Sequence, residues 1–367
     1  MRLDEGKLQR VQDLLEREIE AGRIPGAVIA IGIGGELLVR RALGYAENRM
    51  GVTRELTPET LFDLASLTKV TATLPAVLSL VEDGLLRLTD RVSRYIGSFN
   101  GSFNGSFNSS NAETAHQVTI SHLLTHTSGL PSHRPYYLQY KSETKIRQAL
   151  RAESVDTPPG SRVVYSDVGF MLLGEVVAEV TGLALPEYVK KRIFLPLNMQ
   201  DTGYLPDTNQ YQIAATEEVP GFGVKVGLVH DENAEALGGV AGHAGLFAPV
   251  DDLVRYVQMW LGTSGEVLSP AVRRLAVQCH TEGLNGRRGL GWVKRYDDYD
   301  CTGDLWPASS VSHTGFTGTS IAFDPESKLW LILLTNDVHY GREMRAILRV
   351  RGLVHNLVAA AVRDSSR

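Results

Sequence analysis

The sequence predicts an α+β fold in which one lobe is assembled from both ends of the chain and a mostly helical lobe is inserted between them. β-rich runs lie near the two ends, at residues 27–43 and 311–335, whereas apolar helix patterns occupy the middle. Strands at both ends complete one sheet only when the chain returns to it, so we expect residues 1–62 and 241–367 to form the sheet lobe. Residues 63–240 are expected to form the helical lobe, with an active site between the two lobes.

The first element is an amphipathic helix within residues 1–22, whose apolar side chains recur at helical spacing at Leu8, Val11, Leu14, Leu15 and Ile19. Two β-rich runs follow, residues 27–33 and 37–43, and the Gly34-Gly35 pair between them predicts a hairpin. We expect the helix to cover one face of the resulting sheet. Residues 57–60 mark a turn before the next element.

The composition indicates a globular protein, because 43% of the 367 residues are hydrophobic. The 37 Lys and Arg and 42 Asp and Glu give a net charge of −5 without a dense basic patch, so no nucleic acid partner is expected. Neither a signal peptide nor an apolar run of roughly 18 residues is evident, so we expect a cytoplasmic protein without membrane contact. Cys279 and Cys301 are expected to be free thiols.

The stretch FDLASLTK, residues 62–69, carries the first candidate for chemistry, and an apolar helix pattern follows it at residues 70–81. Ser66 and Lys69 are three residues apart, so on a helix both side chains rise from one face. A serine hydroxyl needs a neighbour that takes its proton as it attacks a carbonyl, and the lysine amine is such a group. The start of the helix would also point backbone N–H groups at an oxyanion.

A second Ser-x-x-Lys pair, Ser142 and Lys145, lies in the polar run of residues 140–148. No apolar helix follows it, so we expect a solvated helix face there. The pair His122 and His126 has the spacing of a metal-binding helix but lacks the glutamate of the H-E-x-x-H motif. We therefore expect packing and loop hydrogen bonds for both histidines, and no metal site.

Residues 97–108 are three tandem copies of Gly-Ser-Phe-Asn, and the low-complexity segment continues to residue 111. Four-residue units of this composition cannot bury a core of their own, so they predict a solvated, mobile insertion in the helical lobe. Whether the repeats cover the cleft stays open.

The later part of the chain brings two further motifs. Tyr165-Ser166-Asp167 precedes an apolar helix pattern at residues 170–180, and His313-Thr314-Gly315 lies in a β-rich run. Between them, the glycine-rich residues 221–245 are typical of loops that connect lobes or line a cleft. An amphipathic helix at about residues 342–362 closes the chain.

In this order the elements Ser66-x-x-Lys69, Tyr165-Ser166-Asp167 and His313-Thr314-Gly315 resemble those of the β-lactamase-related serine hydrolases. That group contains class C β-lactamases, D-alanyl-D-alanine carboxypeptidases and family VIII carboxylesterases. The resemblance covers most of the chain, from residues 24–28 through residues 123–131 to the last strands. It implies the penicillin-binding/class C β-lactamase-like fold, an antiparallel sheet flanked by N- and C-terminal helices, and chemistry without a metal or organic cofactor.

The resemblance also implies the catalytic roles. Ser66 would be the acylated nucleophile, with Lys69 and Tyr165 as the groups that handle its proton. Either group needs a perturbed pKa to act as the base, so the choice between them stays open. The backbone N–H groups of Ser66 and Phe316 would form the oxyanion hole.

Substrate binding is expected at Asp167, His313, Thr314 and Gly315, of which the glycine would allow close approach of the substrate. His313 stands where class C β-lactamases carry lysine, and a neutral imidazole binds a carboxylate less firmly than a permanent cation does. Asp167 stands where they carry asparagine; its carboxylate cannot donate the amide's hydrogen bond, but it can pair with Lys69. His230, Asn233 and His243 are candidates for pocket lining.

These observations predict a serine hydrolase that acts through an acyl-enzyme on a small ester, amide or β-lactam-like substrate. An esterase-like activity is the first expectation. The alternatives are a penicillin-binding D-Ala carboxypeptidase or D-amino-acid peptidase, and a true β-lactamase. A catalytically poor, penicillin-recognising binding protein is the alternative outside the enzymes, and the oligomeric state stays open.

Overall fold

A seven-stranded antiparallel sheet forms the centre of the protein, whose computed structural model describes residues 2–99, 117–343 and 345–363. The strand order is β10-β11-β12-β13-β2-β3-β4. These strands are β2 (Gly26–Ile33), β3 (Glu36–Glu47), β4 (Arg54–Glu55), β10 (Val293–Lys294), β11 (Val311–Thr314), β12 (Ser320–Phe323) and β13 (Leu329–Thr335). β13 pairs with β2 over its whole length, Leu333 opposite Ile29, so both ends of the chain share one sheet as predicted.

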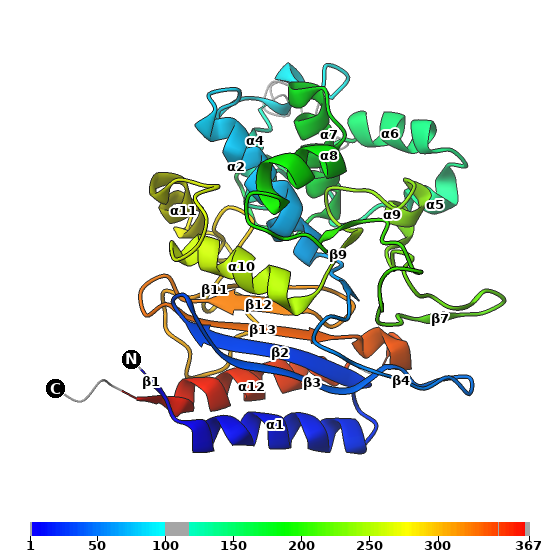
Figure 1. The fold of residues 1–367 in the computed structure, drawn as a ribbon. Coiled ribbons are helices and arrows are strands. Elements are labelled where there is room, and N and C mark those ends of the chain that lie inside the picture. The colour runs from blue at the N-terminus through cyan, green and yellow to red at the C-terminus, as the bar shows by residue number, and fades with distance from the viewer. Residues whose placement is uncertain (1, 100–116, 344, 364–367) are drawn as a thin grey trace.

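Two helices from opposite ends of the chain lie side by side along one face of this sheet, α1 (Glu5–Glu20) and α12 (Ile347–Ala361) (Figure 1). The short strands β1 (Arg2–Leu3) and β14 (Val362–Arg363) pair next to them. Apolar side chains from both helices and the sheet form one core cluster, which includes Leu15, Ile29, Leu331 and Val354. The amphipathic N-terminal helix therefore covers a sheet face as predicted.

The opposite face of the sheet carries α10 (Val250–Leu261), and the helical lobe extends beyond it (Figure 1). The other helical elements are η1 (Lys69–Thr73), α2 (Leu74–Glu82), η2 (Val92–Arg94), α4 (Ile120–Leu124), α5 (Tyr136–Gln139), α6 (Glu143–Arg151), α7 (Asp167–Thr181), α8 (Leu185–Val189), η4 (Lys190–Phe194), α9 (Glu232–Ala236), α11 (Pro270–Val277) and η5 (Asp337–Tyr340). A second apolar cluster runs without a break from the sheet into these helices. The two lobes thus share a core.

A small three-stranded sheet joins the start of the helical lobe to its end. It has the order β5-β9-β6, with β5 (Phe62–Asp63), β9 (Leu246–Ala248) and β6 (Gly203–Tyr204). Phe62 pairs with Ala248, so the segment that enters the helical lobe lies next to the segment that leaves it. Ser66 follows shortly after β5. A two-stranded hairpin, β7 (Glu218–Val219) and β8 (Gly223–Val224), completes the described strands.

Several sequence predictions are confirmed and three helix boundaries are corrected. The hairpin β2–β3 turns at Gly34-Gly35, and Cys279 and Cys301 are free. The helix indicated by the spacing of His122 and His126 is only α4, because the chain leaves it at Thr125 and His126 lies in the loop that follows. The last helix begins at Ile347 rather than near residue 342, and α7 begins at Asp167, because the Ser166 hydroxyl caps it by accepting from the N–H of Gly169.

Two further expectations concern the low-complexity insertion and contact with a membrane. From residue 100 onward, the Gly-Ser-Phe-Asn insertion lies outside the described residues. No single helix in the described part of the chain is long and apolar enough to cross a membrane, although the bent pair of α7 with α8 and η4 passes by length and composition.

Candidate active site

A tight turn after β5 presents Ser66. Ala65, the residue before it, has a φ of +45°, which a residue with a Cβ seldom adopts. The buried carboxylate of Asp63 stabilises this turn, because it accepts hydrogen bonds from the N–H of Ala65 (2.8 Å) and the N–H of His230 (2.6 Å). Burial raises the pKa of Asp63 to about 6 even though both hydrogen bonds oppose the shift. The turn ends where the helical segment begins, so Ser66 lies at a helix start, as expected.

Lys69 points back along this helix start to the nucleophile. Its Nζ donates a hydrogen bond to Oγ of Ser66 over 2.9 Å, and its side chain is 0% exposed. The first turn, η1, is π-helical, and α2 continues it. The predicted contact between Ser66 and Lys69 is therefore present.

Asp167 is the counterion of Lys69. Its Oδ1 lies 2.7 Å from Nζ of Lys69, and the carbonyl oxygen of His243 lies 3.4 Å from the same atom. Burial alone would lower the pKa of Lys69, but the charge of Asp167 and the contact with Tyr165 raise it above the usual value. The amine is thus an ammonium in the resting site. The pairing expected for Asp167 is confirmed, with its side chain 21% exposed.

Tyr165 covers the lysine from a loop that α7 anchors. Nζ of Lys69 lies 4.8 Å from the centre of the tyrosine ring, and the hydroxyl interacts with both Lys69 and Ser66. The ring stacks on Tyr299 at 5.5 Å and packs against His126 at 4.7 Å. Burial raises the pKa of Tyr165, and the ammonium of Lys69 opposes that rise. The structure therefore brings Ser66, Lys69 and Tyr165 together as the sequence predicted.

The histidine pair of the α4 region has the structural roles that were expected. Nδ1 of His122 accepts a hydrogen bond from the N–H of Thr119 in the capping box of α4. Nδ1 of His126 accepts from the N–H of Ser166, which fixes the loop next to Tyr165. Burial lowers the pKa of His126, so it stays neutral. In the part of the chain that is described, no group of three or more His, Cys, Asp or Glu could hold a metal ion.

The third motif lies at the end of β11. The ring of His313 lies 6.2 Å from that of Tyr165, and Nδ1 of His313 makes a 2.9 Å hydrogen bond to the carbonyl of Thr314. Burial, together with the charges of Lys69 and Arg288, lowers the pKa of His313 to about 3. The third motif thus contributes a neutral imidazole rather than a cation.

Gly315 has a structural role in addition to the predicted one. A Cβ at this position would lie 2.3 Å from the carbonyl oxygen of Leu64 and 2.2 Å from Oγ1 of Thr319. The glycine is therefore required because the backbone before Ser66 approaches it closely, and not only because a substrate must approach.

The same contact joins the two segments that carry the predicted oxyanion donors. Oγ1 of Thr317 donates to the carbonyl of Asp63 (2.7 Å), and Oγ1 of Thr319 donates to that of Leu64 (3.2 Å). These bonds join the turn after β11 to the turn that carries Ser66. Among the described residues, the N–H groups of Ser66 and Phe316 have no acceptor, as donors reserved for an oxyanion require.

The side chain of Phe316 is 44% exposed and lies between charged and aromatic neighbours. It stacks on His230 at 5.6 Å, and the guanidinium of Arg345 lies 4.3 Å from its ring centre. Arg345 also donates to the carbonyl of Phe316 and pairs with Asp337. No sequence pattern pointed to Arg345, because it lies in an irregular segment before α12.

The three candidates for pocket lining are buried, and they differ in position. His230 lies behind Phe316. His243 places its carbonyl near Lys69, and its ring bonds to Asp231 over 2.8 Å. Asn233 bonds to the backbone of Arg134 and Tyr137 and so fixes a loop, and its place in the pocket stays a prediction.

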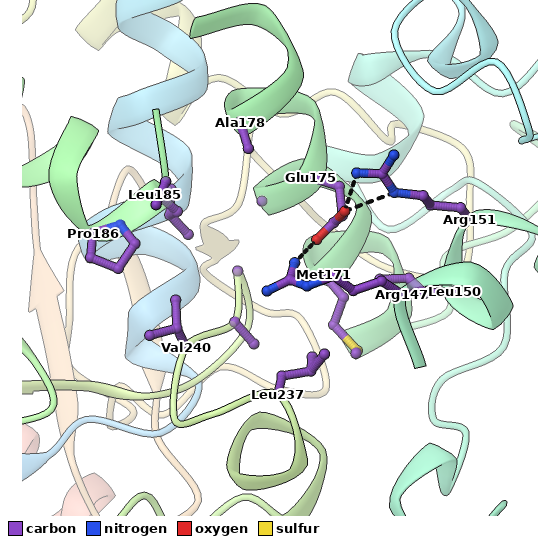
Figure 2. A pocket seen from close by; sticks show the side chains of 14 residues that line it. Arg147, Leu150, Arg151, Met171, Glu175, Ala178, Leu185, Pro186, Leu237 and Val240 are labelled. Atoms are coloured by element: carbon purple, nitrogen blue, oxygen red, sulfur yellow. Dashed lines mark hydrogen bonds and ion pairs between the residues drawn. The ribbon is translucent and has the colours of Figure 1, made fainter. Parts of the chain in front are cut away.

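A cavity of about 320 Å³ lies elsewhere, between α6, α7, α8 and the segment before His243 (Figure 2). The carboxylate of Glu175 at its edge is held by Arg147 and Arg151. The cavity contains none of the predicted catalytic residues. It is thus a separate feature of the helical lobe.

Comparison with known proteins agrees with this geometry. The model of the beta-lactamase family matches residues 11–355. The chain belongs to the beta-lactamase family. Its fold is that of the class C β-lactamases and penicillin-binding proteins, and it is a serine hydrolase of this family.

Two curated relatives cover most of the chain. The N-acetylmuramyl-L-alanine amidase of Bacillus subtilis (strain 168) is 31% identical over 366 residues, which cover 91% of this chain and 81% of the amidase. A putative D-alanyl-D-alanine carboxypeptidase of Escherichia coli O157:H7 is 31% identical over 367 residues, which cover 91% of this chain and 83% of that protein.

Two solved structures share the fold. EstCE1, a hydrolase with promiscuous acyltransferase activity, has a TM-score of 0.76 and 25% identity, with 95% of this chain and 99% of that chain covered. A class C beta-lactamase has a TM-score of 0.75 and 22% identity, with 100% of this chain and 99% of that chain covered.

Proposed function

We propose that this serine hydrolase cleaves a small, uncharged ester or amide through an acyl-enzyme on Ser66. The hydrogen bond from the buried Lys69 to Oγ of Ser66 is the observation that carries the proposal. It places the hydroxyl beside a proton-handling amine. The N–H groups of Ser66 and Phe316, which have no acceptor among the described residues, are the proposed donors to the oxyanion.

In the first half of the reaction, Oγ of Ser66 attacks the carbonyl carbon while its proton passes to the Lys69 and Tyr165 pair. The negative oxygen of the tetrahedral intermediate accepts hydrogen bonds from the N–H groups of Ser66 and Phe316. The intermediate then collapses, the bond to the leaving group breaks, and the pair returns the proton to that group. Water repeats these steps on the acyl-enzyme and releases the acid.

The charges of Lys69 and Asp167 before the reaction restrict the path that the serine proton can take. Lys69 is an ammonium beside the Asp167 carboxylate, so it cannot accept a proton until it has lost one. Tyr165 is a protonated phenol at rest as well, because burial raises its pKa. The serine proton therefore passes either to Lys69, after that ammonium has given a proton to Asp167, or to Tyr165, once the phenol has released its own proton to solvent. In both routes the carboxylate of Asp167 fixes the charge of the pair.

An uncharged substrate is favoured because the cations near the site are already engaged in the described structure. Arg351 is buried and donates to the backbone carbonyls of Gly315 and Thr319, and the others have acidic partners. Lys69 pairs with Asp167, Arg288 with Asp297 and Arg345 with Asp337. His313 adds no charge, since its pKa is lowered to about 3. A substrate carboxylate thus finds no free cation at the third motif. The names of the amidase relative and of EstCE1 support amide and ester substrates.

A D-Ala-D-Ala carboxypeptidase is the second candidate, because Arg345 lies beside Phe316 at the edge of the oxyanion hole. If the Asp337 partner yields, this guanidinium can bind a terminal carboxylate. The curated Escherichia coli relative supports this candidate by name.

Parallel turnover measurements on four substrates test these candidates: p-nitrophenyl butyrate, an acetylmuramyl-L-alanine amide, a peptide that ends in D-Ala-D-Ala, and nitrocefin. The wild type is compared with Ser66→Ala and with Ser142→Ala, the matched change in the second Ser-x-x-K pair. We expect Ser66-dependent turnover of the first or second substrate and unchanged rates for Ser142→Ala. Faster turnover of the D-Ala-D-Ala peptide would support the carboxypeptidase instead. Turnover of none of the four would favour a binding protein.

A further inference from the structure

A buried arginine lies behind the catalytic tyrosine, and no step of the proposed reaction uses it. Arg288 is 1% exposed. One arm of its guanidinium bonds to Asp297 over 2.9 Å, whereas its Nε and Nη1 have no hydrogen-bond partner within the described chain. A buried donor without a partner destabilises the fold, so these two donors need an explanation.

Aromatic stacking connects Arg288 to the site. Its guanidinium carbon lies 4.9 Å from the ring centre of Tyr299, and Tyr299 stacks on Tyr165 at 5.5 Å with an interplanar angle of 21°. The charge of Arg288 also acts on His126 and His313, the two histidines that pack against Tyr165. The guanidinium is thus a buried cation that contacts Tyr299, the ring that stacks on Tyr165.

The groups that face Tyr165 come from five parts of the chain. They are Ser66 and Lys69 at the start of η1, His126 after α4, Asp167 on α7, Arg288 and Tyr299 around β10, and His313 on β11. Both histidines are neutral, and Lys69 is neutralised by Asp167. Arg288 is paired with Asp297, but two of its donor atoms have no hydrogen-bond partner in the described chain.

We propose that Arg288 is a positioning residue for Tyr165, whose buried charge stabilises negative charge on the tyrosine oxygen while that oxygen gives or takes the serine proton. The inference rests on the proposed function of Ser66. The paired Asp297 holds the guanidinium in place and weakens its charge only in part.

The test is the pH dependence of kcat/KM for p-nitrophenyl butyrate in wild type, Arg288→Gln and Arg288→Lys. Loss of the cation removes its stabilisation of the phenolate and so raises the pKa of Tyr165. The acid limb of the pH profile of Arg288→Gln therefore moves to higher pH by about one unit. At pH 7 the rate constant falls at least tenfold. Arg288→Lys keeps a cation and retains most of both properties.

Arg295→Gln is the matched control, because Arg295 forms a buried pair with Asp300 in the same loop region and has no contact with Tyr165 in the described structure. It should lower the melting temperature without moving the acid limb. A shift of the limb in Arg288→Gln alone supports the proposal. An equal profile in both variants, or a profile in Arg288→Lys that matches Arg288→Gln, overturns it.

Asp297→Asn is the variant that tests the inference if Arg288→Gln does not fold. It keeps the cation and removes its counter-charge, so the limb should move to lower pH, and an unmoved limb overturns the inference. Failure of the proposed function looks different, because turnover by the wild type would then be unaffected by Ser66→Ala. With Ser66-dependent turnover established, only the role of Arg288 is at stake.

Discussion

The carboxylate of Asp167 lies 2.7 Å from Nζ of Lys69, and the same nitrogen lies 2.9 Å from Oγ of Ser66. This contact replaces the amide that class C β-lactamases place at the position of Asp167. An amide leaves the lysine charge uncompensated, whereas the carboxylate raises the pKa of Lys69 against the effect of burial. The protonation of the site therefore depends on one ion pair.

Replacing this carboxylate should move the pH profile to lower pH. In Asp167→Asn the ammonium of Lys69 loses its counterion, so its pKa falls. The pKa of Tyr165 also falls, because Asp167 no longer repels a phenolate. Whichever group is the base, the acid limb of kcat/KM shifts downward, and steady-state rates between pH 5 and 9 measure the shift. Asp156→Asn, at an exposed pair with Arg134, is the control and should leave the limb in place. An unmoved limb in Asp167→Asn would mean that the ion pair does not set the protonation of the site.

The imidazole of His313 should not titrate during catalysis. Burial disfavours the imidazolium and lowers its pKa to about 3, so the ring stays neutral at every pH above about 4. His313→Asn should therefore change the rate but keep the shape of the profile between pH 5 and 8. A limb near pH 6.5 that disappears in the variant would show that the ring carries a proton there.

The close contact at Gly315 predicts loss of the oxyanion hole in Gly315→Ala. The added Cβ would meet the carbonyl of Leu64 at 2.3 Å and would push Phe316 away from Ser66. Loss of one oxyanion donor costs about 3 kcal/mol, or roughly a hundredfold in kcat. Gly352→Ala, in α12 with open space around its Cβ, is the control and should be neutral or slightly stabilising. A Gly315→Ala variant with wild-type kcat contradicts this geometry.

Glu175 should matter for stability and not for catalysis. It is buried beside the cavity of Figure 2 and pairs with Arg147 and Arg151, which are each about one-third exposed. In Glu175→Ala both arginines can turn to solvent or to their second partners, Glu143 and Glu179. We expect a loss of about 1–2 kcal/mol in the free energy of unfolding, measured with urea, and unchanged kcat. A large fall in kcat at full folding would connect the cavity to the active site.

Local spacing made much of the site predictable. Ser66 and Lys69 lie on one short helical turn, and the hairpin at Gly34-Gly35 follows from turn chemistry, so neither depends on distant contacts. The early start of α7 was also readable, because Ser166 is a good N-cap before an apolar run.

What escaped prediction depends on contacts between distant segments. Asp63 acts by holding the N–H of His230, which is 167 positions further on, and Arg288 reaches Tyr165 through a ring on another loop. The need for glycine at position 315 comes from a carbonyl near residue 64. No local pattern encodes such pairings, because tertiary packing creates them.

Intact-mass spectrometry after brief exposure to a fluorophosphonate probe tests the assignment of the nucleophile most directly. Wild type and Ser142→Ala should each gain the mass of one adduct, and peptide mapping should place it on Ser66. Ser66→Ala should gain none. Labelling of Ser66→Ala to the extent of the wild type, or an adduct mapped to another serine, would contradict the account of this site.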